Sequence, residues 1–182
     1  MSRYHPLLIL LHWLSALLIF AAFLLGMFAL AEKPNTPEKI VPLGVHIALG
    51  TLTLLLTVIR FIVRRVTHKP LRRVKPALSK PKPLIVTMAE PVQYLLYLFT
   101  FLMSLTGIGL TLQAGVLTGS GIRLPADFYA FSLRAVHGAL STILFVLIVL
   151  HLLTWVYFQF IRGENALAWM WFRAKKKDTP SE

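Results

Sequence analysis

Four of the six histidines in this 182-residue chain lie inside long apolar stretches, where a titratable side chain is unusual. They are His12, His46, His137 and His151. The segment 132–155 alone holds two of them among leucine, isoleucine, valine and phenylalanine. An imidazole can carry a proton or bind a metal ion, and an ionisable residue is costly inside a membrane unless it has such a function. The chemistry of the chain therefore centres on these four rings.

Four apolar segments are long enough to cross a membrane, and three of them contain these histidines. A bilayer core is spanned by about 20 apolar residues, and 57% of this chain is hydrophobic while only 14% is charged. The expected spans are roughly 7–31, 43–63, 92–112 and 135–161. The first exceeds the roughly 7–15 apolar residues of a signal peptide, so we expect it to remain as a span. The sequence predicts an all-α integral membrane protein, a four-helix bundle forming one domain over residues 1–182.

The charge distribution predicts which way the bundle faces. The net charge is +12, and most basic residues lie between the second and third spans or after the fourth. The positive-inside rule places these segments, and hence both termini, in the cytoplasm. We expect the basic loop to contact anionic membrane lipids, and we expect no nucleic-acid partner. Residues 164–173 combine tryptophans with apolar residues, which predicts a short helix in the cytoplasmic interface.

Helix geometry and orientation pair the histidines at two depths. The fourteen residues from His137 to His151 rise about 21 Å and complete almost four turns, so both rings lie on one face near opposite membrane surfaces. The first span runs outward, whereas the second and fourth run inward. His12 therefore lies at the depth of His151 on the cytoplasmic side, and His46 lies at the depth of His137 on the extracytoplasmic side.

Two facing imidazoles inside an apolar bundle can bind the iron of a b-type haem from opposite sides. A zinc site is disfavoured, because the predicted spans contain no acidic residue and the chain has no cysteine. We expect the second nitrogen of each ring to donate to a carbonyl one turn back. Gly50 and Gly138 should let a macrocycle approach, whereas Gly26, Gly107 and Gly109 are expected to be packing or lipid-facing positions.

At these residues the chain resembles the bacterial cytochrome b561 family. The resemblance rests on Leu11-His12-Trp13, Val45-His46-x-x-x-Gly50, Val58-Ile59-Arg60, Val136-His137-Gly138, Leu150-His151 and Asn165-x-Leu167. It implies a multi-pass protein of the bacterial inner membrane that holds two haem b groups. One haem would be bound by His12 and His151, the other by His46 and His137. The family exchanges electrons with the quinone pool.

One branch of that family looks like superoxide oxidase, which passes an electron from superoxide at the extracytoplasmic face to ubiquinone. The resemblance therefore implies superoxide as a candidate donor and superoxide:ubiquinone oxidoreductase as a candidate activity. Members close to that branch tend to carry histidines near the start of the third span and after the last ligand. This chain has Glu90, Gln93, Tyr157 and Phe158 at those places.

Three functions fit these observations. The first is a self-contained dihaem cytochrome that links an extracytoplasmic one-electron donor to quinone and requires no protein partner. The second is the cytochrome b subunit of a larger respiratory enzyme, such as a hydrogenase or formate dehydrogenase, which needs a docking partner. The third is a haem-free carrier of protons or ions. The candidate quinone-binding residues are Trp13, Ser15, Tyr157 and Arg162 on the cytoplasmic side and Arg134 on the outside.

Overall fold

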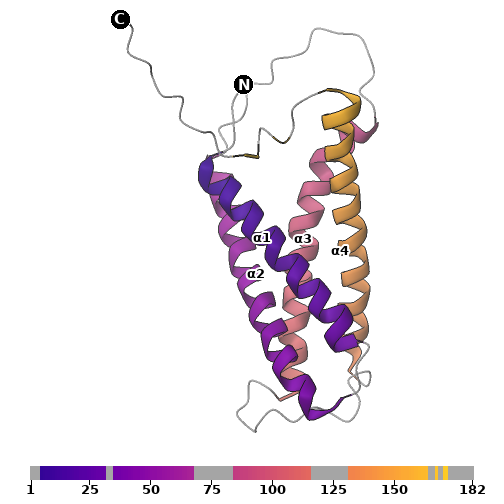
Figure 1. Ribbon diagram of the computed structural model, residues 1–182. Helices are drawn as coiled ribbons and strands as arrows, with labels where there is room; N and C mark the ends of the chain where they lie inside the picture. Colours follow the sequence, from indigo (N-terminus) through magenta and orange to yellow (C-terminus); the bar gives the residue numbers. More distant parts are fainter. Residues whose placement is uncertain are drawn as a thin grey trace, which may run out of the picture.

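The structure is a computed structural model, and its described part is a bundle of four long helices that run alternately up and down (Figure 1). It describes residues 5–31, 35–67, 84–115 and 131–163, together with Leu167, Met170 and Trp171. The elements are α1 (Pro6–Leu24) with its π-helical extension η1 (Leu25–Ala31), the short 3-10 helix η2 (Pro37–Lys39), α2 (Ile40–Thr67), α3 (Leu84–Gln113), and α4 (Ser132–Val156) with its π-helical extension η4 (Tyr157–Ile161).

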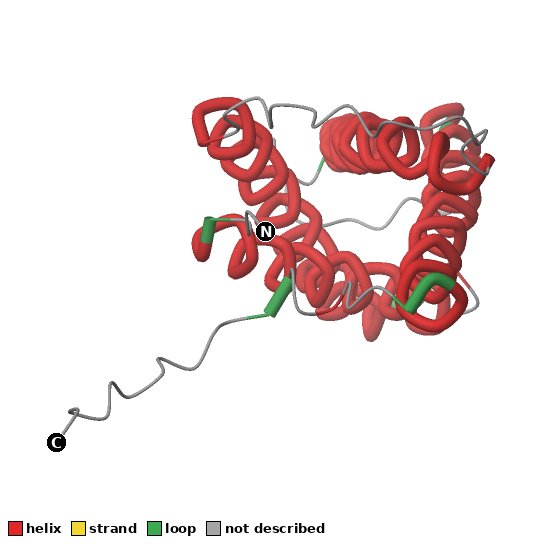
Figure 2. The backbone as a smooth tube through the Cα atoms, turned by 90° about the horizontal axis from the view of Figure 1, so that it is seen from above, coloured by secondary structure: helices red, strands yellow, loops and turns green. Residues whose placement is uncertain are grey.

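Neighbouring helices in the sequence are also neighbours in space. The pairs α1 and α2, α2 and α3, and α3 and α4 pack together along the bundle, and the view from above shows the helices around a common axis (Figure 2). α1 leans across the bundle towards α4, where Phe23 stacks on Phe145 with ring centroids 5.4 Å apart. The start of α1 and the end of α4 lie at the same end of the bundle (Figure 1).

All four helices are long and apolar enough to cross a membrane, which confirms the predicted fold class. The spans are Pro6–Ala31, Pro37–Thr67, Thr87–Gln113 and Ser132–Ile161. They are longer than the predicted apolar cores because polar and basic residues continue the helices past the hydrocarbon. Arg64 and Arg65 occupy the last turn of α2, where long basic side chains can reach the interface and interact favourably with the helix dipole.

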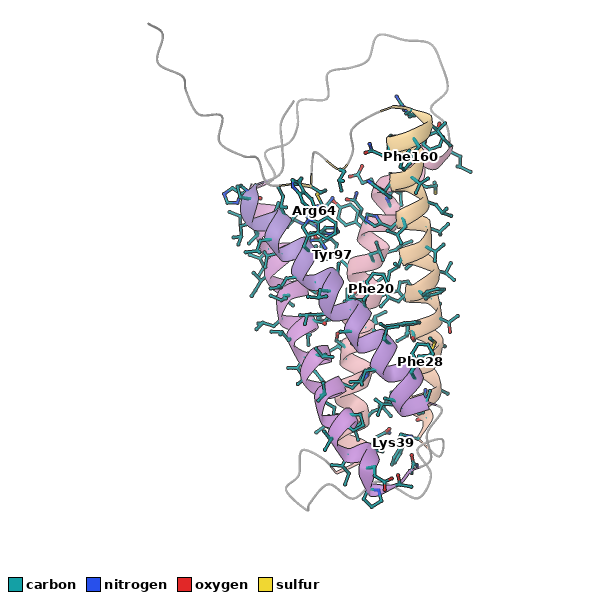
Figure 3. The ribbon with its side chains drawn as sticks, in the orientation of Figure 1. Phe20, Phe28, Lys39, Arg64, Tyr97 and Phe160 are labelled. Atoms are coloured by element: carbon teal, nitrogen blue, oxygen red, sulfur yellow. The ribbon has the colours of Figure 1, made fainter. Side chains whose placement is uncertain are left out.

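The outside of the bundle is apolar, unlike the surface of a soluble protein. Large apolar side chains cover the outside, including Phe20, Phe28 and Phe160 (Figure 3), and Phe160 is 70% exposed. Several buried positions instead carry hydroxyl groups; these are Ser15, Thr53, Thr57, Thr100 and Thr111. Lipid is as apolar as leucine, so apolar burial does not drive these helices together, and small or hydroxyl-bearing residues allow their close packing.

The predicted interfacial helix at 164–173 lies mostly outside the described residues. The part that is described meets the start of α1. Trp13 Nε1 donates a 2.9 Å hydrogen bond to the carbonyl of Met170, and the rings of Trp13 and Trp171 lie 6.2 Å apart. This contact ties the chain beyond η4 to the same end of the bundle as the first turns of α1.

Which end faces the cytoplasm stays a prediction from charge, and the absence of cysteine from the chain makes it testable. Glu38 and Thr67 are exposed near opposite ends of α2. In right-side-out spheroplasts, Glu38→Cys should react with a membrane-impermeant maleimide, and Thr67→Cys should react only after lysis. The parent chain should stay unlabelled, and the reverse pattern would show that the bundle faces the other way.

Candidate metal centres

The structure brings the four histidines together in two facing pairs. The rings of His12 on α1 and His151 on α4 have centroids 6.3 Å apart, with planes inclined by 66°. The rings of His46 on α2 and His137 on α4 are also 6.3 Å apart, inclined by 76°. Following the predicted orientation, we call these the inner pair and the outer pair. The pairs are the ones that the depth of each histidine in the membrane predicts: His12 with His151, and His46 with His137.

The separation of the rings matches a shared metal ion. A metal–imidazole bond is about 2.0–2.1 Å long and the ring centre lies about 1.1 Å further, so an ion held between two rings in line separates their centres by roughly 6.3 Å. Among the described residues, no group of three or more histidine, aspartate or glutamate side chains could hold a metal ion. Each pair offers two facing imidazoles, which would be the protein's ligands to the iron of a bound haem.

The outer pair rests on glycines from the two remaining helices. A Cβ atom added to Gly26 would lie 3.1 Å from Cε1 of His46, and one added to Gly107 would lie 3.4 Å from Cε1 of His137. Gly26 also belongs to the π-helical turn η1, a local widening that often occurs at functional sites. Sequence reasoning treated both glycines as ordinary packing or lipid-facing positions and missed these contacts.

The expected carbonyl partners for the second ring nitrogens are absent for three of the histidines. Nδ1 of His12 and Nδ1 of His46 are buried without a hydrogen-bond partner, and Nδ1 of His137 instead lies 3.0 Å from the hydroxyl of Thr106 on α3. The expectation is therefore wrong for these three rings. Side chains and backbone of neighbouring helices surround the rings in their place.

The glycines expected to admit a macrocycle differ from each other. No atom lies within 4 Å of a Cβ added to Gly50, so the space beside this turn of α2 is open. A Cβ added to Gly138 would lie 3.2 Å from a guanidinium nitrogen of Arg134, one turn earlier on α4. Gly50 therefore fits the expectation, whereas Gly138 makes room for an arginine of its own helix.

An arginine lies beside the inner pair that sequence reasoning did not assign to the site. Arg60 follows His46 by fourteen residues on α2, the same spacing that separates His137 from His151 on α4. Its guanidinium lies 5.2 Å from the centroid of the Tyr97 ring on α3. The spacing on α2 was the available signal, because it places Arg60 on the face of His46.

The candidate quinone residues lie near both ends of the bundle, and several are already engaged. The Trp13 indole donates to Met170 as described, and Ser15 donates a 2.6 Å hydrogen bond to the carbonyl of Leu11. Tyr157 is half-buried, and the Arg162 guanidinium lies 5.7 Å from the centroid of the Phe158 ring. Arg134 lies three residues before His137 on α4. Their role in quinone binding stays a prediction.

Two of the places where the resemblance expects histidine are also located. The side-chain carbonyl of Gln93 accepts a 3.1 Å hydrogen bond from Arg64, while Glu90 is exposed. The Arg64 guanidinium lies 5.0 Å from the centroid of the Tyr94 ring, near Tyr97 (Figure 3). A cation–aromatic cluster between α2 and α3 therefore occupies this end of the bundle.

Two facing imidazole pairs inside a four-helix membrane bundle are an arrangement suited to binding haem. A family model described as prokaryotic cytochrome b561 matches residues 3–173, and the chain belongs to this family. No curated protein and no solved structure gives a significant match. The chain is thus a multi-pass membrane protein of electron transport that binds b-type haem.

The contact between Gly26 and His46 yields a mutational test. Gly26→Val should push the His46 ring out of line and lower the haem bound at the outer pair by more than half, because the added atoms meet the ring at 3.1 Å or less. Gly44→Val is the matched control, since no atom lies within 4 Å of a Cβ at Gly44. Haem per chain is measured by pyridine haemochromogen assay. Equal haem contents in the two variants would contradict the contact.

Proposed function

We propose that this protein is a self-contained dihaem b-type cytochrome of the bacterial inner membrane. It would carry electrons between an extracytoplasmic one-electron donor, such as superoxide, and ubiquinone. The observation that carries the proposal is the occurrence of two imidazole pairs, each with centroids 6.3 Å apart, that share α4. When bound, haem iron supplies reversible one-electron chemistry. The four histidines would hold the iron, and the bundle would set the spacing and the surrounding charges.

The arrangement of α4 supports electron transfer between the two surfaces. His137 and His151 place one ligand of each centre on the same helix face, about 21 Å apart along its axis. Leu144 lies midway between them, seven residues from each, and is only 6% exposed. An apolar, closely packed region between the centres keeps water away from both and lowers the local dielectric.

Cations beside each pair support the binding of negatively charged groups. Arg60 would hold carboxylates of the inner haem, since a guanidinium is suited to carboxylate recognition. At the other end, Arg134 lies close enough to Lys39 for the two charges to interact. Lys39 Nζ donates a 3.0 Å hydrogen bond to Asn35 (Figure 3 labels Lys39). A cation three residues before His137, with a second cation near it, favours the approach of an anionic donor such as superoxide.

The proposed function is tested by removing one ligand of the inner pair. The purified parent protein should contain two b-type haems per chain, become reduced by superoxide, and be reoxidised by ubiquinone-1. His151→Ala should lose the inner haem and keep the outer one, because the two pairs share no residue. Its remaining haem should still accept electrons from superoxide and react with ubiquinone at least tenfold more slowly.

These outcomes separate the proposal from its alternatives. A colourless parent protein that is folded would support a haem-free carrier of protons or ions. A protein that holds both haems and reacts with neither superoxide nor ubiquinone would indicate a cytochrome subunit that requires a docking partner. Loss of both haems from His151→Ala, with the helical content unchanged, would contradict two independent centres.

The role of Arg60 is tested by neutralising its charge. Arg60→Gln should lower the midpoint potential of the inner haem on the order of 50 mV, because removing a nearby positive charge favours the ferric state. Arg65→Gln is the matched control on the same helix, since Arg65 is exposed and lies over the Phe61 ring. Redox titration monitored by visible absorption measures both potentials. Equal shifts in the two variants would exclude a specific role for Arg60.

A further inference from the structure

Thr106 on α3 makes a contact with the outer pair that its place in the sequence did not indicate. Its Oγ1 atom lies 3.0 Å from Nδ1 of His137 on α4. The same oxygen lies 2.9 Å from the carbonyl of Met103 and 3.1 Å from that of Leu102, both in the preceding turn of α3. One hydroxyl group is therefore within hydrogen-bond distance of a ring nitrogen and two backbone carbonyls.

Counting protons favours one arrangement of donors and acceptors. A carbonyl oxygen can only accept, and the hydroxyl of Thr106 has a single proton to give. If that proton went to His137, the threonine oxygen would face two carbonyl oxygens at 2.9 and 3.1 Å with no proton between them. All three contacts are satisfied when the hydroxyl shares its one proton between the two carbonyls in a three-centre bond and Nδ1–H of His137 donates to the hydroxyl oxygen.

We infer that Thr106 is a positioning residue for His137, fixing the ring in the tautomer that carries its proton on Nδ1. Nε2 is then the nitrogen with a free lone pair, as an iron ligand requires. The Cε1 edge of the same ring packs against Gly107, the next residue of α3. Thr106 and Gly107 thus form a seat for His137. The inference rests on the proposed haem-binding role of the outer pair.

This seat makes the two rings of the outer pair chemically different. His46 faces His137 across 6.3 Å, yet its Nδ1 is buried without a hydrogen-bond partner. A ring whose Nδ1–H is hydrogen-bonded is a more basic ligand, and a more basic ligand stabilises ferric over ferrous iron. Thr106 therefore lowers the potential of the outer haem and holds the His137 plane at its 76° inclination to His46.

A purely structural role for the hydroxyl is the competing explanation, and α4 contains its control. Thr142 also donates to the carbonyl four residues earlier, that of Gly138, at 3.2 Å. Its side chain is exposed. Threonines in membrane helices commonly form this bond to their own helix. Thr142→Val removes the same type of bond as Thr106→Val and leaves the histidine pairs intact.

The experiment compares Thr106→Val, Thr106→Ser and Thr142→Val in the detergent-purified, haem-loaded protein. Thr106→Val should raise the midpoint potential of the outer haem and shift its ferric low-spin EPR signal, because the ring is less basic and free to turn. The inner haem should be unchanged, and Thr106→Ser and Thr142→Val should match the parent. If Thr106→Val loses the outer haem altogether, retention by Thr106→Ser supports the assignment, and loss from both variants overturns it. Unchanged potential and EPR in haem-loaded Thr106→Val also overturn it.

A second measurement needs no haem and separates this inference from the proposed function. In haem-free protein labelled with ¹⁵N-histidine, NMR should show His137 protonated at Nδ1, with the signal assigned by its loss in His137→Gln. In Thr106→Val that signal should move towards the Nε2-protonated form. The expected tautomer in a parent protein that cannot bind haem would refute the proposed function and leave the role of Thr106 standing. An Nε2-protonated His137 in the haem-free parent would overturn the role of Thr106.

Discussion

The arrangement of this bundle depends on one constraint: an imidazole ring needs polar partners, and the membrane interior has no water to supply them. A neutral ring has one donor and one acceptor nitrogen, and both lose hydrogen bonds when the ring enters the membrane. The structure meets this need in two ways: it turns rings towards each other in pairs, and it supplies at least one of them with a hydroxyl. The remaining buried nitrogens of His12 and His46 have no such partner. An ion held between the two rings of a pair would occupy the one lone pair that each neutral ring offers.

The four helices contribute different residues to the histidine pairs and their surroundings. α4 carries one histidine of each pair, α1 and α2 each carry one partner, and α3 carries none. α3 instead contributes Thr106 and Gly107, which seat His137, and Tyr97, which lies under Arg60. A helix without a ligand therefore shapes both ends of the site. Hydroxyl groups at buried positions let the helices approach closely enough to do so.

The sequence was sufficient to predict the spans, which follow from hydrophobic length. It was also sufficient to predict which histidines pair, because this follows from their depth along antiparallel helices. The sequence was not sufficient to predict that Thr106 contacts His137 or that Gly26 lies against His46. Their contacts depend on how far α3 and η1 are rotated about their own axes, and periodicity says only which residues of one helix share a face. The carbonyl partners expected for the rings were wrong for the same reason, because atoms of other helices reach the rings first. Arg60 could have been found, since it repeats on α2 the fourteen-residue spacing of the α4 histidines.

The length of α4 between His137 and His151 has an energetic consequence for the cell. With the bundle oriented as its charges predict, an electron passing from the outer pair to the inner pair carries negative charge towards a cytoplasm that is already negative. Moving one charge through the whole membrane against 100 mV takes about 2.3 kcal/mol, and the roughly 21 Å between the ligands is about two-thirds of a 30 Å hydrocarbon core. Inward electron flow along this bundle would therefore work against the membrane voltage and add to it, converting part of the redox energy of the donor into stored electrical energy.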